Sequence, residues 1–444
     1  MSFRSSSMSR RHFLVRAVPT AITGLLIAVI GVVTFSVPTF GSAPAALPER
    51  NVSFHGYHVR VPASWPVVHL GAASSACVRF DRHAVYLGAP TSAERCPAHL
   101  IAAKKEALLI EPLAARPGAY VTLADPVAHQ YVVTDAAAGV RVTATYGSNQ
   151  ALIEHILAMA AAANRASPPV SPMIPTIHRL SAAAARGPRP RGTRAASLPA
   201  GATSDIGLGF DTCSAPTQAT MNAWISHSPY GAVGIYIGGS DRACAQPDLT
   251  ADWVSHQASA GWHFLPLYVG PQAEWAEVTA PASQGTDSAD DAVRQAESLG
   301  FGQGAPLYYD MEAYPRRQSG RAIAFLVAWT NELHRQGYAS GVYSSSASAV
   351  ADLVEHDASV GSAMPDVIFD AWWNGMADTR DPVIPPRDWA HHRRLHQYSG
   401  GATHRYGGHS LNIDTDYLDV LLPPGGVLYG TAQVPLQASR LLVH

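Results

Sequence analysis

Apolar and polar positions in the C-terminal half of the chain follow two alternating patterns. Short, nearly continuous apolar runs, typical of buried strands, recur eight times between residues 206 and 423. The predicted strands are 207–212, 232–239, 263–270, 305–312, 339–345, 366–373, 393–399 and 411–419. Stretches with helical spacing separate the first six strands, and one of them, at 320–337, has an apolar face.

This alternation favours an α/β fold, a TIM-barrel-like (β/α)8 domain at 206–423 with a parallel sheet covered by helices. Gly261, Gly300 and Gly337 follow three of the helical stretches, where a C-terminal cap requires a positive φ. An open doubly wound sheet is the alternative. The chain has neither a GxGxxG sequence nor a P-loop to support it.

The residues before the predicted barrel do not show this regular alternation of strands and helices. Residues 47–164 contain short strand-like runs and close with a helical stretch, which predicts a small α+β domain to which the sequence assigns no role. Residues 165–205 are rich in Pro, Ala, Ser and Arg without an apolar period, and predict an extended linker. Its arginines could alternatively contact an anionic cell envelope. Residues 424–444 form a C-terminal tail.

Residues 1–45 have the layout of an export signal: a basic start, an apolar stretch, then small residues. The pair Arg10–Arg11 lies in "SRRHFL", which resembles a twin-arginine signal. A permanent membrane anchor is the alternative. Both place the rest of the chain outside the cytoplasm, either extracellular or associated with the cell wall or membrane. Contact with a membrane is then expected only through this segment.

The amino-acid composition limits the kinds of partner and cofactor that we expect. Charged residues make up 14% of the chain and the formal net charge is −2, which suggests no nucleic-acid partner. The four cysteines fall two in each predicted domain, Cys77 and Cys96 before the linker and Cys213 and Cys244 after it. Outside the cytoplasm they predict disulfides. They lack the CxxC-like pairs of a zinc site, and we expect no metal or other cofactor.

Acidic residues gather at the ends of the predicted strands, where a barrel carries its active site. The six residues are Asp211, Asp310, Glu312, Asp370, Asp414 and Asp416. Since side chains alternate along a strand, Asp310 and Glu312 point the same way, as do Asp414 and Asp416. We expect both pairs to face the barrel mouth.

Converging carboxylates raise some of one another's pKa values, which separates a protonated acid from an ionised partner. Glycoside hydrolysis needs this combination: one carboxylic acid protonates the leaving oxygen, and another carboxylate stabilises or captures the sugar cation. Glu312 is the predicted proton donor and Asp310 the stabilising carboxylate.

Aromatic residues at or beyond the strand ends could stack on sugar rings. Tyr268, Tyr314 and Trp372 are the candidates assigned to substrate binding. Trp373 follows Trp372 directly, so only one of the two can point inward. The histidines of "HHRRLHQY" do not complete a metal-ligand spacing.

Four motifs, "GFDTC", "YYDMEAY", "HQYSG" and "NIDTDYLD", resemble in order and spacing a glycoside-hydrolase-like domain of unknown function from exported actinobacterial proteins. That group is similar to glycoside hydrolase family 25, the lysozymes that cut peptidoglycan within a modified (β/α)8 barrel. The resemblance covers about residues 205–423. It implies Glu312 as general acid, an acidic groove and an adjoining Gln-Tyr pair. The remaining implied residues are Asp211, Asp310, Asp414, Asp416, Gln397 and Tyr398. Asp370 has no counterpart in the lysozymes.

Three functions follow as hypotheses. The first is an exported hydrolase of a β-linked amino-sugar polymer of the peptidoglycan type, acting through its carboxylates or through the N-acetyl group of the substrate. The second is a non-catalytic protein that binds cell-wall polysaccharide in the same groove. The third is an acid cluster that binds Mg²⁺ or Ca²⁺ for hydrolysis of another bond.

Overall fold

The computed structural model describes residues 48–71, 74–90, 96–113, 120–164, 178–179, 198–199, 201–357 and 363–422. The predicted export signal, most of the predicted linker and the tail at 424–444 lie outside these residues.

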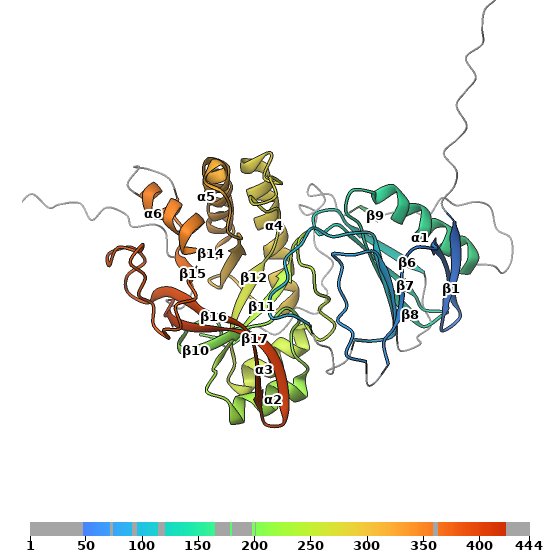
Figure 1. Ribbon diagram of the computed structural model, residues 1–444, viewed down its shortest axis with the longest axis horizontal. Coiled ribbons are helices and arrows are strands. Elements are labelled where there is room, and N and C mark those ends of the chain that lie inside the picture. The colour runs from blue at the N-terminus through green and yellow to red at the C-terminus, as the bar shows by residue number, and fades with distance from the viewer. Residues whose placement is uncertain are drawn as a thin grey trace, which may run out of the picture. The chain divides into compact units, whose positions relative to one another are not determined.

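The N-terminal domain combines a hairpin, a seven-stranded sheet and one helix, as expected for a small α+β domain (Figure 1). The hairpin consists of β1 (Glu49–Phe54) and β2 (Tyr57–Pro62). The sheet has the order β3 (Val67–His69), β4 (Ala84–Leu87), β5 (Ala107–Pro112), β8 (Val140–Thr145), β7 (Gln130–Asp135), β6 (Val121–Asp125) and β9 (His178–Arg179). Helix α1 (Gln150–Asn164) packs Ile153 and Ile156 in one apolar core with Leu108 and Val142 of the sheet.

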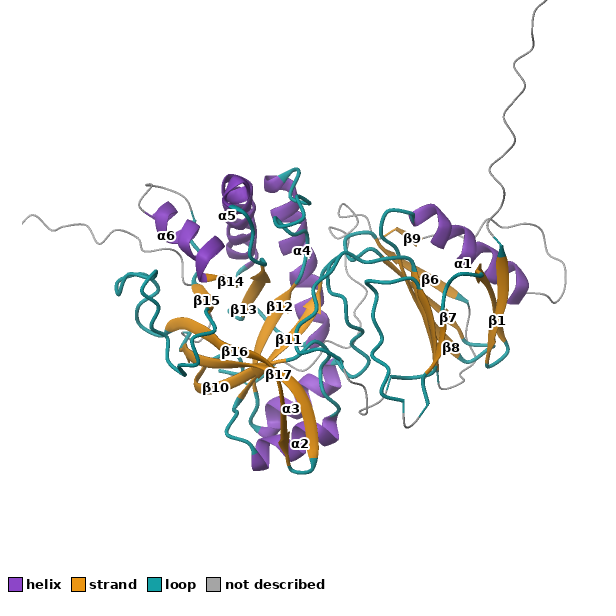
Figure 2. Ribbon diagram, in the orientation of Figure 1, coloured by secondary structure: helices purple, strands orange, loops and turns teal. Residues whose placement is uncertain are grey.

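The C-terminal domain is a closed eight-stranded barrel, and all eight predicted strands are confirmed. Its strands are β10 (Asp205–Asp211), β11 (Ala232–Gly238), β12 (His263–Tyr268), β13 (Pro306–Asp310), β14 (Ala339–Ser345), β15 (Val367–Ala371), β16 (Arg393–Tyr406) and β17 (His409–Val420). In Figure 2 the helices of this domain lie outside the strands, as the alternating pattern predicts.

A helix follows each of the first five barrel strands. The helices are α2 (Gln218–His227), α3 (Ala251–Ala260), α4 (Pro281–Leu299), α5 (Ser319–Gln336), and α6 (Ala351–Asp357), with short helical turns at Arg316–Gln318 and Ser346–Val350. Helices α4 and α5 pack side by side (Figure 1). Helices α3, α4 and α5 end at Gly261, Gly300 and Gly337, each with the predicted positive φ. None of the helices in the described ranges is long and apolar enough to cross a bilayer.

The last strand departs from the prediction of an all-parallel sheet. Strands β10 to β16 pair in parallel, whereas β17 runs antiparallel to both β16 and β10. The reason is local: β16 turns through Gly407 and Gly408 directly into β17, and a tight hairpin can only return the chain antiparallel. Asp414 is consequently level with Asp211, while Asp416 pairs with Gly209, deeper in the barrel.

Side chains on the barrel strands separate into two apolar clusters. One cluster fills the interior and includes Tyr236, Leu267, Tyr343 and Leu418. The other lies between the strands and their helices and includes Tyr268. The side of its strand on which a residue lies therefore decides whether it can reach the barrel mouth.

Candidate active site

Five carboxylates meet in the interior of the barrel at the ends of three strands. Asp211 ends β10, Asp310 ends β13 with Glu312 just beyond it, and Asp414 and Asp416 lie on β17. All except Glu312 are buried. The Glu312 side chain keeps 27% of its surface exposed, so it is the carboxylate that meets solvent.

Asp211 is fixed by two hydrogen bonds. The Tyr236 hydroxyl donates to Oδ1 at 3.2 Å, and Gln397 Nε2 donates to Oδ2 at 2.8 Å. Gln397 Oε1 in turn accepts hydrogen bonds from the Tyr343 hydroxyl at 3.0 Å and from Trp373 Nε1 at 2.9 Å. Burial, and then the nearby Asp414 charge, raise the pKa of Asp211 to about 7.

The backbone around Asp310 and Glu312 is held by Gln272. Its Nε2 donates to the Asp310 carbonyl at 2.8 Å, and its Oε1 accepts from the Glu312 N–H, also at 2.8 Å. Burial and the charge of Glu312 raise the pKa of Asp310 well above its ordinary value. This fixed geometry brings the two acids together, as the one-residue spacing predicts.

Asp416 lies deepest among the five carboxylates. Within the described residues, neither of its carboxylate oxygens has a hydrogen-bond partner. Burial, followed by the charges of Asp211 and Asp414, raises its pKa well above the ordinary value. Contrary to the prediction, Asp416 is inside the barrel rather than at its mouth.

A histidine from the N-terminal domain enters this cluster. His99 Nε2 lies 2.7 Å from Glu312 Oε1, and Nδ1 lies 2.6 Å from the Tyr236 hydroxyl oxygen. Although burial acts to lower the pKa of His99, the Glu312 charge raises it to about 10. For Glu312, burial acts to raise the pKa, but the charge of His99 outweighs it and the pKa is lowered. The pair is therefore an imidazolium and a carboxylate.

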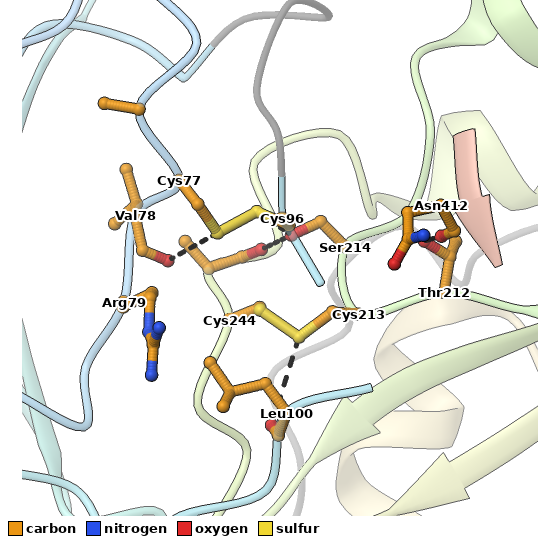
Figure 3. Close-up of a disulfide and its surroundings, with 12 residues drawn as sticks. Cys77, Val78, Arg79, Cys96, Leu100, Thr212, Cys213, Ser214, Cys244 and Asn412 are labelled. Atoms are coloured by element: carbon orange, nitrogen blue, oxygen red, sulfur yellow. Dashed lines mark hydrogen bonds between the residues drawn. A yellow bond between two sulfur atoms is a disulfide. The ribbon is translucent and has the colours of Figure 1, made fainter. Parts of the chain in front are cut away.

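The segment that carries His99 is fastened to the barrel. Its Ala98 N–H donates to Asn412 Oδ1 at 2.6 Å, and its Ala102 N–H donates to the Asp241 carbonyl at 3.2 Å. The disulfide Cys77–Cys96 lies at the start of the segment, beside the barrel disulfide Cys213–Cys244 (Figure 3). The disulfides predicted for each domain are thus confirmed.

Four of the predicted substrate-binding residues do not join the carboxylate cluster. Tyr268 faces the helices and its hydroxyl donates to Asp291 at 2.9 Å. The Tyr314 hydroxyl donates to Asp352. Asp370 contacts Ser346 and Asp381, and Tyr398 makes its side-chain hydrogen bond with Thr415. The assignments of Tyr268, Tyr314 and Asp370 to this site are wrong, because each side chain lies on the helix-facing side or packs against a helix.

The positions of the two adjacent tryptophans also differ from the prediction that Trp372 binds substrate. Trp373, 62% exposed, reaches Gln397 and so borders the cluster, whereas the Trp372 carbonyl accepts a hydrogen bond from His396 Nε2. Trp373 rather than Trp372 is the aromatic residue at the site.

The sequence interpretation missed four residues of the site. Tyr236 and Tyr343 occupy inward positions near the ends of predicted strands, so strand alternation could have found them. Gln272 follows its strand by four residues, and His99 lies in an irregular segment of another domain. Neither has a local sequence signal that connects it with the acids.

A polar cavity of about 690 Å³ is lined by residues that are close in sequence to two acids of the site. Thr212, which follows Asp211, and Asn412, two residues before Asp414, both line it. Arg79 and Pro97 of the N-terminal domain complete part of its wall. Hydroxyl and amide groups of this kind can hydrogen-bond a polar ligand.

The distances within the cluster would also suit a cation. The nearest ligand atoms of His99, Asp310 and Glu312 lie within 4.8 Å of one another. The His99 imidazolium already supplies a positive charge at this position, so we assign no metal there. The divalent-cation hypothesis remains the third of the three functions.

The family comparison finds a match within the barrel domain. A family model described as "Rv2525c-like, glycoside hydrolase-like domain" matches residues 222–418. No curated protein matches the chain in sequence.

Three solved structures are similar to the chain. A B. stearothermophilus protein is 20% identical, with 48% of this chain and 95% of that chain covered and a TM-score of 0.36. The Tat-secreted protein Rv2525c of Mycobacterium tuberculosis, in complex with L-tartrate, is 17% identical, with 49% and 97% covered and a TM-score of 0.37. The catalytic domain of the endolysin ply40, from bacteriophage P40 of Listeria monocytogenes, is 15% identical, with 48% and 93% covered and a TM-score of 0.30.

Proposed function

We propose that the protein hydrolyses glycosidic bonds in a cell-wall glycan of the peptidoglycan type, since residues 222–418 match the model of an Rv2525c-like, glycoside hydrolase-like domain. The observation that carries this proposal is the cluster of carboxylates at the barrel mouth whose pKa values are shifted in opposite directions. Asp310 and Asp211 have raised pKa values, whereas that of Glu312 is lowered. Glycoside hydrolysis needs a protonated group and an ionised group side by side.

Glu312 remains the proposed proton donor, on the condition that it first receives a proton from a neighbouring group. Its lowered pKa means that it carries a proton only after receiving one, and His99 Nε2 lies 2.7 Å away. The leaving oxygen would take its proton from this pair as the C–O bond breaks, and the attacking water would later return a proton. Asp211, with a pKa of about 7, ionises near neutral pH and is suited to stabilise the sugar cation, whereas Asp310, whose pKa is raised well above its ordinary value, keeps its proton.

Two surface features support a sugar substrate. The exposed ring of Trp373 can stack on a pyranose face while its Nε1 is held by Gln397. The adjoining cavity offers hydroxyl and amide groups to further sugar residues.

Peptidoglycan lies outside the cytoplasm, and export of this protein is part of the proposal. Two disulfides favour it, and the similar protein Rv2525c is described as Tat-secreted.

The test is hydrolysis by the full-length protein. We expect new reducing ends from purified peptidoglycan or chitooligosaccharides, detected by mass spectrometry, and a fall of about 100-fold or more in Glu312→Gln. Asp310→Asn should also lose activity. Asp287→Asn, an exposed change on α4, should leave the rate as in the wild type. Absence of release by the wild type from both substrates would refute the hydrolase proposal.

Burial favours a second candidate, a glycan-binding protein without catalysis. Asp211, Asp310, Asp414 and Asp416 are each 1% exposed or less, so a bound glycan would contact mainly Glu312 and its surroundings. In this case the protein would sediment with purified cell wall but release no reducing ends. Sedimentation unchanged in Glu312→Gln and Asp310→Asn would then favour binding over hydrolysis.

A further inference from the structure

We propose that His99 is a positioning residue of the carboxylate site, and that the N-terminal domain is therefore a required part of that site. Nothing in the fold of a barrel demands a second domain at its mouth. In this protein the second domain supplies a side chain in direct contact with the exposed acid, Glu312. The activity arm of the test below rests on the proposed function, and the titration arm does not.

Both ring nitrogens of His99 are engaged by barrel residues. Nε2 contacts Glu312 and Nδ1 contacts Tyr236, whose hydroxyl donates to Asp211. Because that hydroxyl has one hydrogen and gives it to Asp211, Nδ1 is the donor in its own contact. Since Glu312 is a carboxylate, Nε2 is a donor as well. His99 thus links β13 to β10 through one continuous chain of hydrogen bonds.

The backbone on either side of His99 is held as firmly as the ring. Asn412 accepts from the Ala98 N–H on one side, and Ile101 forms an isolated bridge with Arg242 on the other. Farther along, the buried Lys104 Nζ donates to the Gly239 carbonyl at 3.2 Å. These contacts attach the segment at both ends, so the position of the imidazole is defined by the barrel rather than by a free loop.

The charges around His99 explain what it does. Asp211, Asp310, Glu312 and Asp414 all act on its charge, from β10, β13 and β17. The phenols of Tyr236 and Tyr343, from β11 and β14, complete its surroundings, with ring centroids at 5.8 and 6.1 Å. One imidazolium among four carboxylates reduces their mutual repulsion and holds Glu312 ionised and oriented toward the site.

The activity arm compares His99→Gln with His99→Lys in the full-length protein. Gln removes the positive charge, and we expect reducing-end release to fall about 10- to 100-fold, because Glu312 is no longer oriented. The basic limb of the pH–rate profile should move to lower pH, because the proton that the His99–Glu312 pair keeps up to a pKa of about 10 is then carried by the Glu312 carboxyl group alone. Lys keeps a cationic donor and should recover part of the rate. His155→Gln, an exposed change on α1, is the matched control and should behave as the wild type.

The titration arm needs no substrate. We expect NMR of the imidazole resonances to show His99 titrating several pH units above an ordinary histidine, and to shift back toward the ordinary range in Glu312→Gln. An ordinary titration in the wild type, or one unaffected by Glu312→Gln, would overturn the proposal. So would a His99→Gln protein with wild-type rate and pH profile. If the wild type cleaves neither glycan, the hydrolase proposal fails, while the titration still decides the role of His99.

Discussion

Gly239→Ala should destabilise the folded protein by about 4 kcal/mol or more, the range seen when a side chain is forced into backbone. Gly239 follows β11 with a φ of +108°, a conformation that residues with a side chain rarely adopt. An added Cβ would lie 1.8 Å from the Val269 carbonyl oxygen and 2.3 Å from its carbon. Both are main-chain atoms, so no side-chain rotation can relieve the overlap.

Soluble yield and thermal unfolding followed by circular dichroism measure this effect. The matched control is Gly320→Ala in the first turn of α5, where an added Cβ meets no atom within 4 Å. This substitution should be neutral or raise the free energy of unfolding by about 0.5–1 kcal/mol, because alanine has fewer conformations in the unfolded chain. A Gly239→Ala protein that melts with the wild type would contradict the close approach of β11 and the end of β12.

The free energy of unfolding should fall as the pH rises from 5 to 7, and buried acids are the cause. Burial, followed by Asp381, raises the pKa of Asp370 to about 8, and that of Asp211 is raised to about 7. Between the ordinary value near 3.8 and these raised values, the folded protein keeps a proton that the unfolded chain has lost. The stability is therefore full below the unfolded pKa and is lost as the pH rises toward the folded one.

The size of the effect is about 1.4 kcal/mol per pH unit for each such acid. His99 acts in the same direction above pH 6.5, because its pKa is raised. Lys104, whose pKa burial lowers to about 7, acts in the opposite direction above that pH. Between pH 5 and 6.5 the acids therefore act without His99 and Lys104, and thermal melts across this interval should shift by several degrees.

Asp370→Asn tests the assignment within this interval. The Asn side chain cannot ionise but can still hydrogen-bond Asp381 and Ser346, so the slope of stability against pH should decrease by about 1.4 kcal/mol per unit. Asp287→Asn removes an exposed acid on α4 and should leave the slope unchanged. An equal slope in Asp370→Asn and the wild type would mean that Asp370 is ionised in the folded protein.

The N-terminal domain supplies His99 to the carboxylate site, a role that its own sequence did not suggest. Its segment from Cys96 to Ala102 is hydrogen-bonded to Asn412 of β17 and to Asp241, which follows β11, and carries His99 between these two contacts. If Glu312 acts as an acid, its protonation is controlled by a residue more than 200 positions earlier in the chain. A barrel fragment alone would lack that residue.

The strands, the helices and the set of acids could all be predicted from the amino-acid sequence. Strand and helix periods differ, and the strands from β11 to β15 are buried on both faces, so apolar runs and helical patterns could be recognised without a structure. The one-residue spacing of Asp310 and Glu312 likewise placed both on one side of their strand, because side chains alternate. Pairing within each domain made both disulfides predictable from cysteine position.

The direction in which each side chain points, and the residues that it contacts, depend on the packing of the whole fold. Strands apolar on both faces give no signal of which side is inside, and Tyr268 and Asp370 consequently were assigned to a mouth that they do not reach. The antiparallel direction of β17 depends on a hairpin, which moved Asp416 into the interior. Contact between His99 and Glu312 depends on how two domains pack, and the protonation of the pair follows from that contact. No local pattern in a sequence encodes it.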